Sequence, residues 1–295
     1  MKKLTIIGMI MVLGTLVVSG ISPYLKIVDM TGSMEDATVK VKTVLTDQGY
    51  EILGSYQPGG ETELHVVVFT SEKIKTLCKG VKGRSMLAAA MKVGFQKKEG
   101  KISVSILNPE YLFYAYFRDK MDESAFKSSA LAISTEIKNA MKSVGNLQKP
   151  FGGDLSIMDL KKYHYMMGMP YFDDPVKLAD FESFSQGLTR IQRNLSAGKG
   201  NTVKVYEIID KGSNIAVFGV GLSNPEEGEA NFLPIIGESH VAAMPYEIIL
   251  LNNRASILHG RYRFALHWPE LTMKTFTKIM SSPGDVEDAM KELVK

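Results

Sequence analysis

Alternating and continuous apolar runs mark the strands of this chain, and apolar residues three or four apart mark its helices. In the strand that ends at Leu107, for example, Ile102, Val104 and Ile106 share one face, as a half-buried strand requires. The pattern predicts, for the N-terminal half, a helix from Gly32 to Gly49, strands at 50–56 and 64–69 around a Pro-Gly-Gly turn, a helix at 72–79, and a hairpin of strands at 91–96 and 102–107.

A longer helix and a connector follow. Apolar residues form one stripe over 123–144, and Asp122 and Gly145 bracket the helix as caps. Residues 147–175 read as a connector. At its end, Asp174 and Pro175 resemble the N-cap and first residue of a helix that continues to about Leu195.

The C-terminal half repeats this mixture of strands and helices. The predicted elements are strands at 202–209, 214–222, 245–251 and 256–268, followed by two helices. Helices and strands do not alternate strictly, so the sequence predicts antiparallel α+β modules rather than a doubly wound parallel sheet.

A motif that occurs twice indicates how the halves are related. SILNPEY at 105–111 and ALHWPEL at 265–271 each end an alternating run at a Pro-Glu pair, and an Ala-Met step precedes each run, at 90–91 and at 243–244. We interpret this as an internal duplication of two similar antiparallel sheet-plus-helix modules. The predicted organisation is a signal peptide or N-terminal membrane anchor at 1–25, a first module at 32–120, a linking helix and connector at 121–175, and a second module at 176–295.

The N-terminus has the pattern of an export signal. Lys2 and Lys3 precede an uncharged apolar stretch from Leu4 to Leu25. Cleavage would fall near Val18-Ser19-Gly20, but about 20 apolar residues also suffice to span a bilayer. The sequence therefore predicts a periplasmic protein, or one held at the extracytoplasmic face of the inner membrane through residues 4–25.

The amino-acid composition narrows the class of protein and of partner. The 295 residues are 45% hydrophobic and 23% charged, as in folded globular proteins. Of 35 basic residues, 33 remain without Lys2 and Lys3, against 32 acidic residues, so a nucleic-acid partner is not expected. Cys78 is the single cysteine, which excludes an intrachain disulfide, and its helical spacing from apolar neighbours predicts a buried hydrophobic role.

Several segments resemble a known group of proteins. They are GYEILGSYQPG at 49–59, ILNPEYL at 106–112, KKYHYMMGMPYFDDP at 161–175, and LHGRYRFALHWPELTMKTFTKIMSSPG at 258–284. With these segments the chain resembles uncharacterised exported bacterial proteins, and its first module is similar to the domain of unknown function 302 family. The resemblance implies a fold and an exported setting, and it transfers no catalytic residue.

The connector is the first candidate site. His164, Met166 and Met169 offer an imidazole and two thioethers, the soft ligands that suit Cu(I). These side chains converge only if the chain turns at Gly168, and Met167 would face the opposite way. The alternative is a hydrophobic seam between the modules in which tyrosine packs and methionine fills gaps.

The strand predicted to end at Trp268 is the second candidate. If it is regular, His259, Arg261, Arg263 and His267 project from one face and form a surface for a carboxylate or phosphate. The alternatives are a solvated strand face paired with acidic neighbours, or a bulge at Gly260 that turns His259 to the apolar side.

Sequence alone leaves two classes of function open. Nucleotide-binding and hydrolase motifs are absent in any convincing form. We therefore expect a non-enzymatic module that binds a small ligand or an exported protein. An enzyme would have to bring His164 or His267 near Asp173, Asp174 or Glu270. The Glu110 and Glu270 carboxylates, each directly after a proline, also fit the first turn of a helix.

Overall fold

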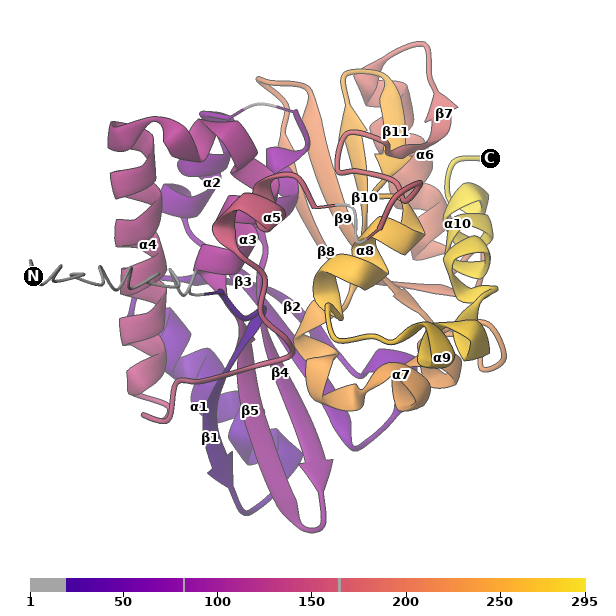
Figure 1. Ribbon diagram of the computed structural model, residues 1–295. Helices are drawn as coiled ribbons and strands as arrows, with labels where there is room; N and C mark the ends of the chain where they lie inside the picture. The colour runs from indigo at the N-terminus through magenta and orange to yellow at the C-terminus, as the bar shows by residue number, and fades with distance from the viewer. Residues whose placement is uncertain (1–19, 82, 164–165) are drawn as a thin grey trace, which may run out of the picture.

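The structure is a computed structural model that describes residues 20–81, 83–163 and 166–295. It has the predicted α+β class: two antiparallel sheets, each accompanied by helices, lie side by side (Figure 1). The predicted export segment at 4–19 lies outside the described residues. Within the described ranges, none of the helices has the length and apolar character needed to cross a membrane.

The first module and the linking segment run from Tyr24 to Lys161. Their elements in chain order are β1 (Tyr24–Met30), α1 (Met34–Asp47), β2 (Glu51–Tyr56), η1 (Pro58–Gly60), β3 (Leu64–Thr70), α2 (Glu72–Lys79), η2 (Gly83–Ala89), β4 (Met91–Lys98), β5 (Lys101–Leu107), α3 (Pro109–Phe117), η3 (Arg118–Asp122), α4 (Ser124–Lys142), β6 (Lys149–Phe151) and α5 (Ile157–Lys161).

The second module runs from Val176 to Glu292. Its elements are β7 (Val176–Asp180), α6 (Phe184–Ser196), β8 (Thr202–Asp210), β9 (Ile215–Leu222), α7 (Glu229–Ile236), η4 (Glu238–Ala243), β10 (Tyr246–Leu251), β11 (Arg254–Ile257), α8 (Gly260–His267), α9 (Met273–Phe276), η5 (Thr277–Ile279) and α10 (Ser282–Glu292). The elements labelled η are 3₁₀ helices.

The two sheets have the same strand order. The first is β2-β3-β4-β5-β1, extended by β6, and the second is β8-β9-β10-β11-β7. β-Bulges also fall at equivalent places in the two sheets. Ile27 is an extra residue of β1 opposite β5, and its counterpart Leu178 is an extra residue of β7 opposite β11. Likewise, Leu53 is an extra residue of β2 opposite β3, and Val205 is an extra residue of β8 opposite β9. Because a bulge is specific to its position in a sheet, this agreement supports the predicted internal duplication.

The predicted pairing of the repeats was wrong, however. Residues 265–267 lie inside α8, so ALHWPEL does not end a strand as SILNPEY does. The strand registers instead match Ser105–Tyr111 with Ser256–Tyr262, that is, SILNPEY with SILHGRY. In both segments a strand ends, one residue caps a helix, and the helix follows.

Four other assignments differ from the predictions. Strand β1 begins at Tyr24, within the segment assigned to a signal or anchor, and its central position between β5 and β6 buries Tyr24 completely. The segment after Pro175 is strand β7, not a helix, because it pairs with β11. Helix α6 begins only after Ser183, whose side chain accepts a hydrogen bond from the backbone nitrogen of Gln186. Glu123, not Asp122, precedes α4.

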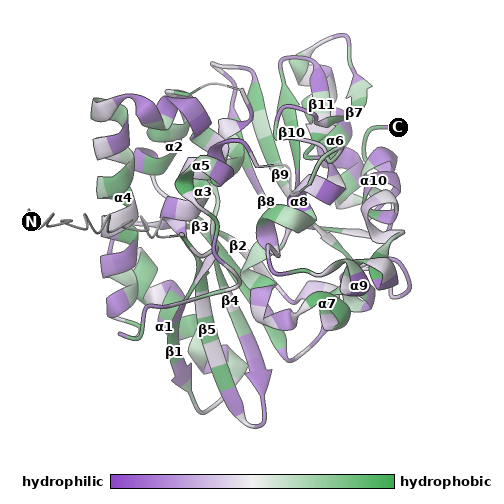
Figure 2. Cartoon of the chain, viewed as in Figure 1, coloured by the Kyte–Doolittle hydropathy of each residue, from purple (hydrophilic) through white to green (hydrophobic). Residues whose placement is uncertain are grey.

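Hydrophobic residues are concentrated in the buried strands, and hydrophilic residues are more frequent in the outer helices. Figure 2 shows mostly hydrophobic residues along β9 and β10, whose side chains are nearly all buried, and hydrophilic residues mixed into α4. Helix α1 covers β2, β3 and β4, α4 packs on α1, α2 and α3, and α6 covers the second sheet. Cys78 is buried in α2 as predicted, and burial raises the pKa of its thiol.

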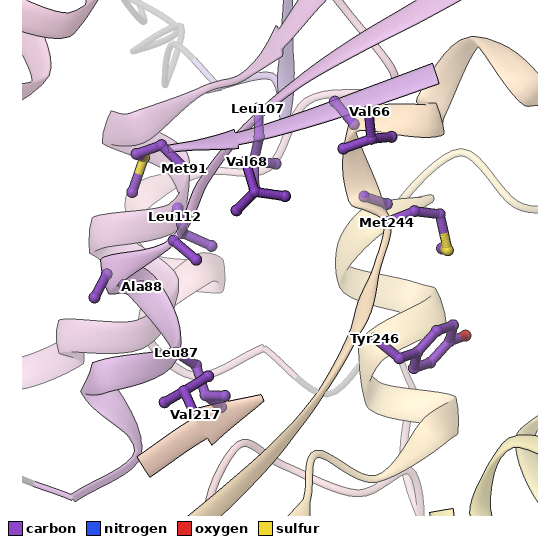
Figure 3. Packing of buried hydrophobic residues seen from close by; sticks show 14 of the residues in the cluster. Val66, Val68, Leu87, Ala88, Met91, Leu107, Leu112, Val217, Met244 and Tyr246 are labelled. Carbon is purple, nitrogen blue, oxygen red and sulfur yellow. The ribbon is translucent and has the colours of Figure 1, made fainter. Parts of the chain in front are cut away.

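The modules contact each other through equivalent surfaces. Helix η4 lies against β3, β4 and β5, and η2 lies against β9 and β10. Figure 3 shows Leu87 of η2 beside Val217 of β9. Strands β2 and β8 meet at Gly54, where a Cβ atom would lie 2.0 Å from the carbonyl oxygen of Val205. Only glycine fits this position without displacing the backbone of the other module.

Candidate functional site

An apolar cavity lies beside α8. It has a volume of about 270 Å³, near the lower limit of the roughly 300–1,000 Å³ typical of ligand pockets. Three segments line it: the connector, α8, and the region from Leu271 to Met280 that contains α9 and η5. The lining residues are Met166, Met169, Arg261, Phe264, Ala265, Leu271, Met273, Phe276 and Met280.

Local sequence sets the position of α8. His259 is its N-cap, and the Nδ1 atom of His259 accepts a hydrogen bond from the backbone nitrogen of Arg261 at 3.2 Å. Gly260 permits close contact with α10, because a Cβ atom there would lie 2.9 Å from the Cβ of Pro283. The first turn of α8 is thereby fixed, with the exposed side chain of Arg261 bordering the cavity.

The predicted strand face of His259, Arg261, Arg263 and His267 was wrong, because residues 260–267 form a helix. A helix projects successive side chains about 100° apart, so residues two apart do not share a face. Arg263 and His267 are four apart and both 1% exposed. Arg261 instead borders the cavity, and His259 acts as the cap. Because nearly the whole of α8 is buried, it lacks the apolar stripe that would have identified it as a helix.

Arg263 belongs to a buried cluster of charges between the modules. Its Nε atom lies 3.4 Å from Glu247 Oε2, and it donates hydrogen bonds to the carbonyl oxygens of Ala243 and Pro245 at 2.6 and 2.8 Å. The guanidinium lies 3.7 Å from the ring centroid of Tyr246. Lys92 of β4 forms an ion pair with the other oxygen of Glu247. The cluster thus joins the two sheets.

Lys92 and Glu247 occupy equivalent places in the duplicated modules. Val68 lies opposite Lys92 in the first sheet, and Gly219 lies opposite Glu247 in the second. Val68 and Gly219 are also the first residues paired beyond the bulges of β2 and β8. The ion pair therefore joins equivalent positions of the two modules, at their pseudo-twofold axis.

His267 is enclosed by the same region. Burial, together with the nearby charges of Arg263 and Lys92, lowers the pKa of His267 well below its usual value. The imidazole is therefore neutral at pH 7. The carboxylates considered as its partners lie elsewhere: Asp173 forms ion pairs with Arg84 and Arg118, and Glu270 contacts His240.

The connector divides into two parts. Its aromatic residues Tyr163 and Phe172 are buried against α8, and the Tyr163 hydroxyl donates a hydrogen bond to the carbonyl oxygen of Ala265 at 3.1 Å. Met166 and Met169 line the cavity, whereas Met167 is 95% exposed. His164 lies outside the described residues. Asp174 accepts a hydrogen bond from the backbone nitrogen of Tyr171 and caps no helix.

A second boundary between the modules holds a buried carboxyl group. Glu229, the first residue of α7, is 1% exposed and accepts hydrogen bonds from the Tyr56 hydroxyl at 2.9 Å and the Gly59 backbone nitrogen at 3.0 Å. Burial raises the pKa of Glu229 to about 7, although these hydrogen bonds and a backbone bond from Leu222 oppose the shift. Sequence reasoning missed this residue, since it resembled one of several acids in a surface loop.

The described side chains offer thioether groups rather than a carboxylate or imidazole cluster for a metal ion. In residues 20–81, 83–163 and 166–295, no three His, Cys, Asp or Glu side chains gather in a group suited to a metal ion. Thioether ligands are a separate case, and four methionines border the cavity beside α8: Met166, Met169, Met273 and Met280.

Comparisons with known proteins give little further information. No family model and no curated protein matches the chain. Among solved structures, it is similar to an uncharacterized conserved protein, DUF302, from Bacillus stearothermophilus, with a TM-score of 0.35 and 12% sequence identity. That match covers 41% of this chain and 98% of the other.

Proposed function

We propose that this protein is a non-enzymatic ligand-binding protein that holds a small apolar ligand in the cavity beside α8. The observation that carries the proposal is the lining, in which Arg261 is the single charged residue among nine. Exposed apolar surface of this kind is costly in water and commonly marks an interaction site.

The methionines support a binding role. Met273 and Met280 are 48% and 58% exposed, and Met166 is 45% exposed, so three flexible apolar side chains surround one opening. Methionine adapts its shape to a partner because it is unbranched and polarizable. These side chains can therefore close over ligands of somewhat different shape.

Binding of a neutral apolar dye tests the proposal. N-phenyl-1-naphthylamine, which fluoresces in apolar surroundings, is expected to bind the wild-type chain in a saturable manner. The variant Met273→Gln/Met280→Gln should bind it severalfold more weakly, because the amides make the opening polar at similar side-chain volume. Met158→Gln is the matched control, since Met158 is 74% exposed and lies outside the cavity lining. Absent or unchanged binding would contradict the proposal.

Soft-metal binding is the second candidate function. It is favoured by the position of Met166 and Met169, which line the same space as Met273 and Met280 and would supply thioether ligands for Cu(I). Titration with Cu(I) against a competing chelator tests it. Affinity that stays the same in Met166→Leu/Met169→Leu would exclude these ligands.

An exported setting is part of the proposal. Its support is the sequence pattern of Lys2 and Lys3 before the apolar stretch 4–25, in which residues 20–25 belong to the folded module. Mass spectrometry of the native N-terminus distinguishes a cleaved signal, with a new terminus near Gly20, from a retained membrane anchor. An intact N-terminus on a protein found in the cytosolic fraction would contradict export.

A further inference from the structure

The duplication assigns a counterpart to the charged residue of the cavity. Because Ser105–Tyr111 and Ser256–Tyr262 occupy equivalent positions, Glu110 of α3 corresponds to Arg261 of α8. Each follows the first residue of its helix by one position and lies on the same helical turn. The two modules can therefore be compared at this point.

In the first module the charge of Glu110 is neutralised by another side chain of the protein. Lys138 of α4 lies 2.9 Å from Glu110 Oε2, and both side chains are partly exposed. Helix α4 has 19 residues and packs on α3, so the Glu110 carboxylate has its partner on the neighbouring helix. The carboxylate also lies at the N-terminal end of α3, where the helix dipole favours negative charge.

In the second module shorter elements follow α8. They are α9, of 4 residues, η5, of 3, and α10, which begins at Ser282 and packs on α8. The cavity lies between α8, the connector and the segment that contains α9 and η5. Arg261 borders it, and among the described residues no carboxylate lies within 4.0 Å of its guanidinium. The N-terminal end of α8 adds partial positive charge at the same place.

We propose, building on the function proposed above, that the ligand is a monocarboxylate with an apolar tail. In the first module Lys138 is the positive partner of Glu110; in the second module the ligand carboxylate is the negative partner of Arg261. The carboxylate accepts two parallel hydrogen bonds from the Arg261 guanidinium. The tail lies among Phe264, Phe276 and the methionines. One guanidinium balances one negative charge, so a monoanion fits better than a phosphate dianion.

Calorimetric titration of the full chain with three probes of equal tail length tests this inference. Octanoate is expected to bind about tenfold or more tightly than octanol, the gain typical of a charge-assisted hydrogen bond, and octylamine is expected to bind most weakly. In Arg261→Gln the preference for octanoate over octanol should disappear while octanol affinity is unchanged. Arg193→Gln, an exposed arginine at the end of α6, is the matched control and should keep the preference.

The outcomes separate this inference from the proposed function. Equal affinities for octanoate and octanol in the wild type, or a preference that survives in Arg261→Gln, would overturn the monocarboxylate assignment and leave an apolar cavity. If none of the three probes binds, the proposed function itself fails. Loss of octanol binding in Arg261→Gln would show that the side chain supports the fold of the cavity rather than recognising the anion.

Discussion

Replacement of Glu229 by glutamine is expected to change how stability depends on pH. Glu229 is buried at the boundary between the modules, and burial raises its pKa from 4.5 to about 7. The amide keeps the shape of the side chain and can still accept from the Gly59 backbone nitrogen, while the Tyr56 hydroxyl can reverse and accept from the amide. The variant therefore removes the titration with little change in packing.

The direction in which the free energy of unfolding changes with pH follows from proton binding. A carboxyl group whose pKa is higher in the folded state binds more protons there than in the unfolded state, so the free energy of unfolding falls as pH rises. The full contribution is present below about pH 4.5 and is lost as pH passes through about 7. At about 1.4 kcal/mol per pH unit of difference, the total loss is about 3 kcal/mol.

Urea denaturation at pH 4.5, 6, 7 and 8 measures this effect. The difference in unfolding free energy between Glu229→Gln and the wild type should grow in favour of the variant by about 3 kcal/mol between pH 4.5 and 8. Glu226→Gln, an exposed acid in the preceding loop, is the control and should give a nearly constant difference. Burial also lowers the pKa of His240 and His267, but the resulting pH dependence cancels between variant and wild type. A constant difference for Glu229→Gln would refute the reasoning.

Two further predictions concern the contact between the modules. Glu247→Gln should cost about 3–5 kcal/mol of stability, because it leaves Lys92 and Arg263 buried without a carboxylate, whereas Lys92→Met should cost less because the pair of Glu247 and Arg263 remains. Chemical denaturation at pH 7 ranks the two variants, and the reverse order would contradict this account. Gly54→Ala should cost about 1–3 kcal/mol, because its Cβ atom would overlap a backbone carbonyl of β8. Gly212→Ala, whose nearest neighbour is 3.5 Å away, is the control, and equal thermal stability of both variants would count against close contact of β2 and β8.

Local patterns predicted much of the first module. The strand at 64–69, the helix at 72–79 and the hairpin that ends at Leu107 are present as β3, α2, β4 and β5. These elements have clear periodicity and end at residues that cap or turn the chain. Ser71, for example, caps α2 by accepting from the backbone nitrogen of Ile74. Such signals depend on neighbours in sequence, so they can be read without the fold.

The same local signals failed where tertiary burial overrides them. Helix α8 is buried on nearly all sides, so it lacks an apolar stripe, and its chance alternation resembled a strand. That error also misaligned the repeat. The shared letters of SILNPEY and SILHGRY, at 105–111 and 256–262, were the signal that would have corrected both, because Asn108 and His259 each cap the helix that follows.

The sequence by itself determined the α+β class, the duplicated arrangement and most strands, because these depend on period-two and period-3.6 burial within short segments. Only the tertiary structure decided which charges meet. Lys92 and Glu247 are 155 residues apart and pair because the duplication places them at one axis. In the same way, the cavity gathers Met166, Met169 and Arg261, which the sequence had assigned to separate sites, because the fold brings the connector against α8 and the segment from Leu271 to Met280.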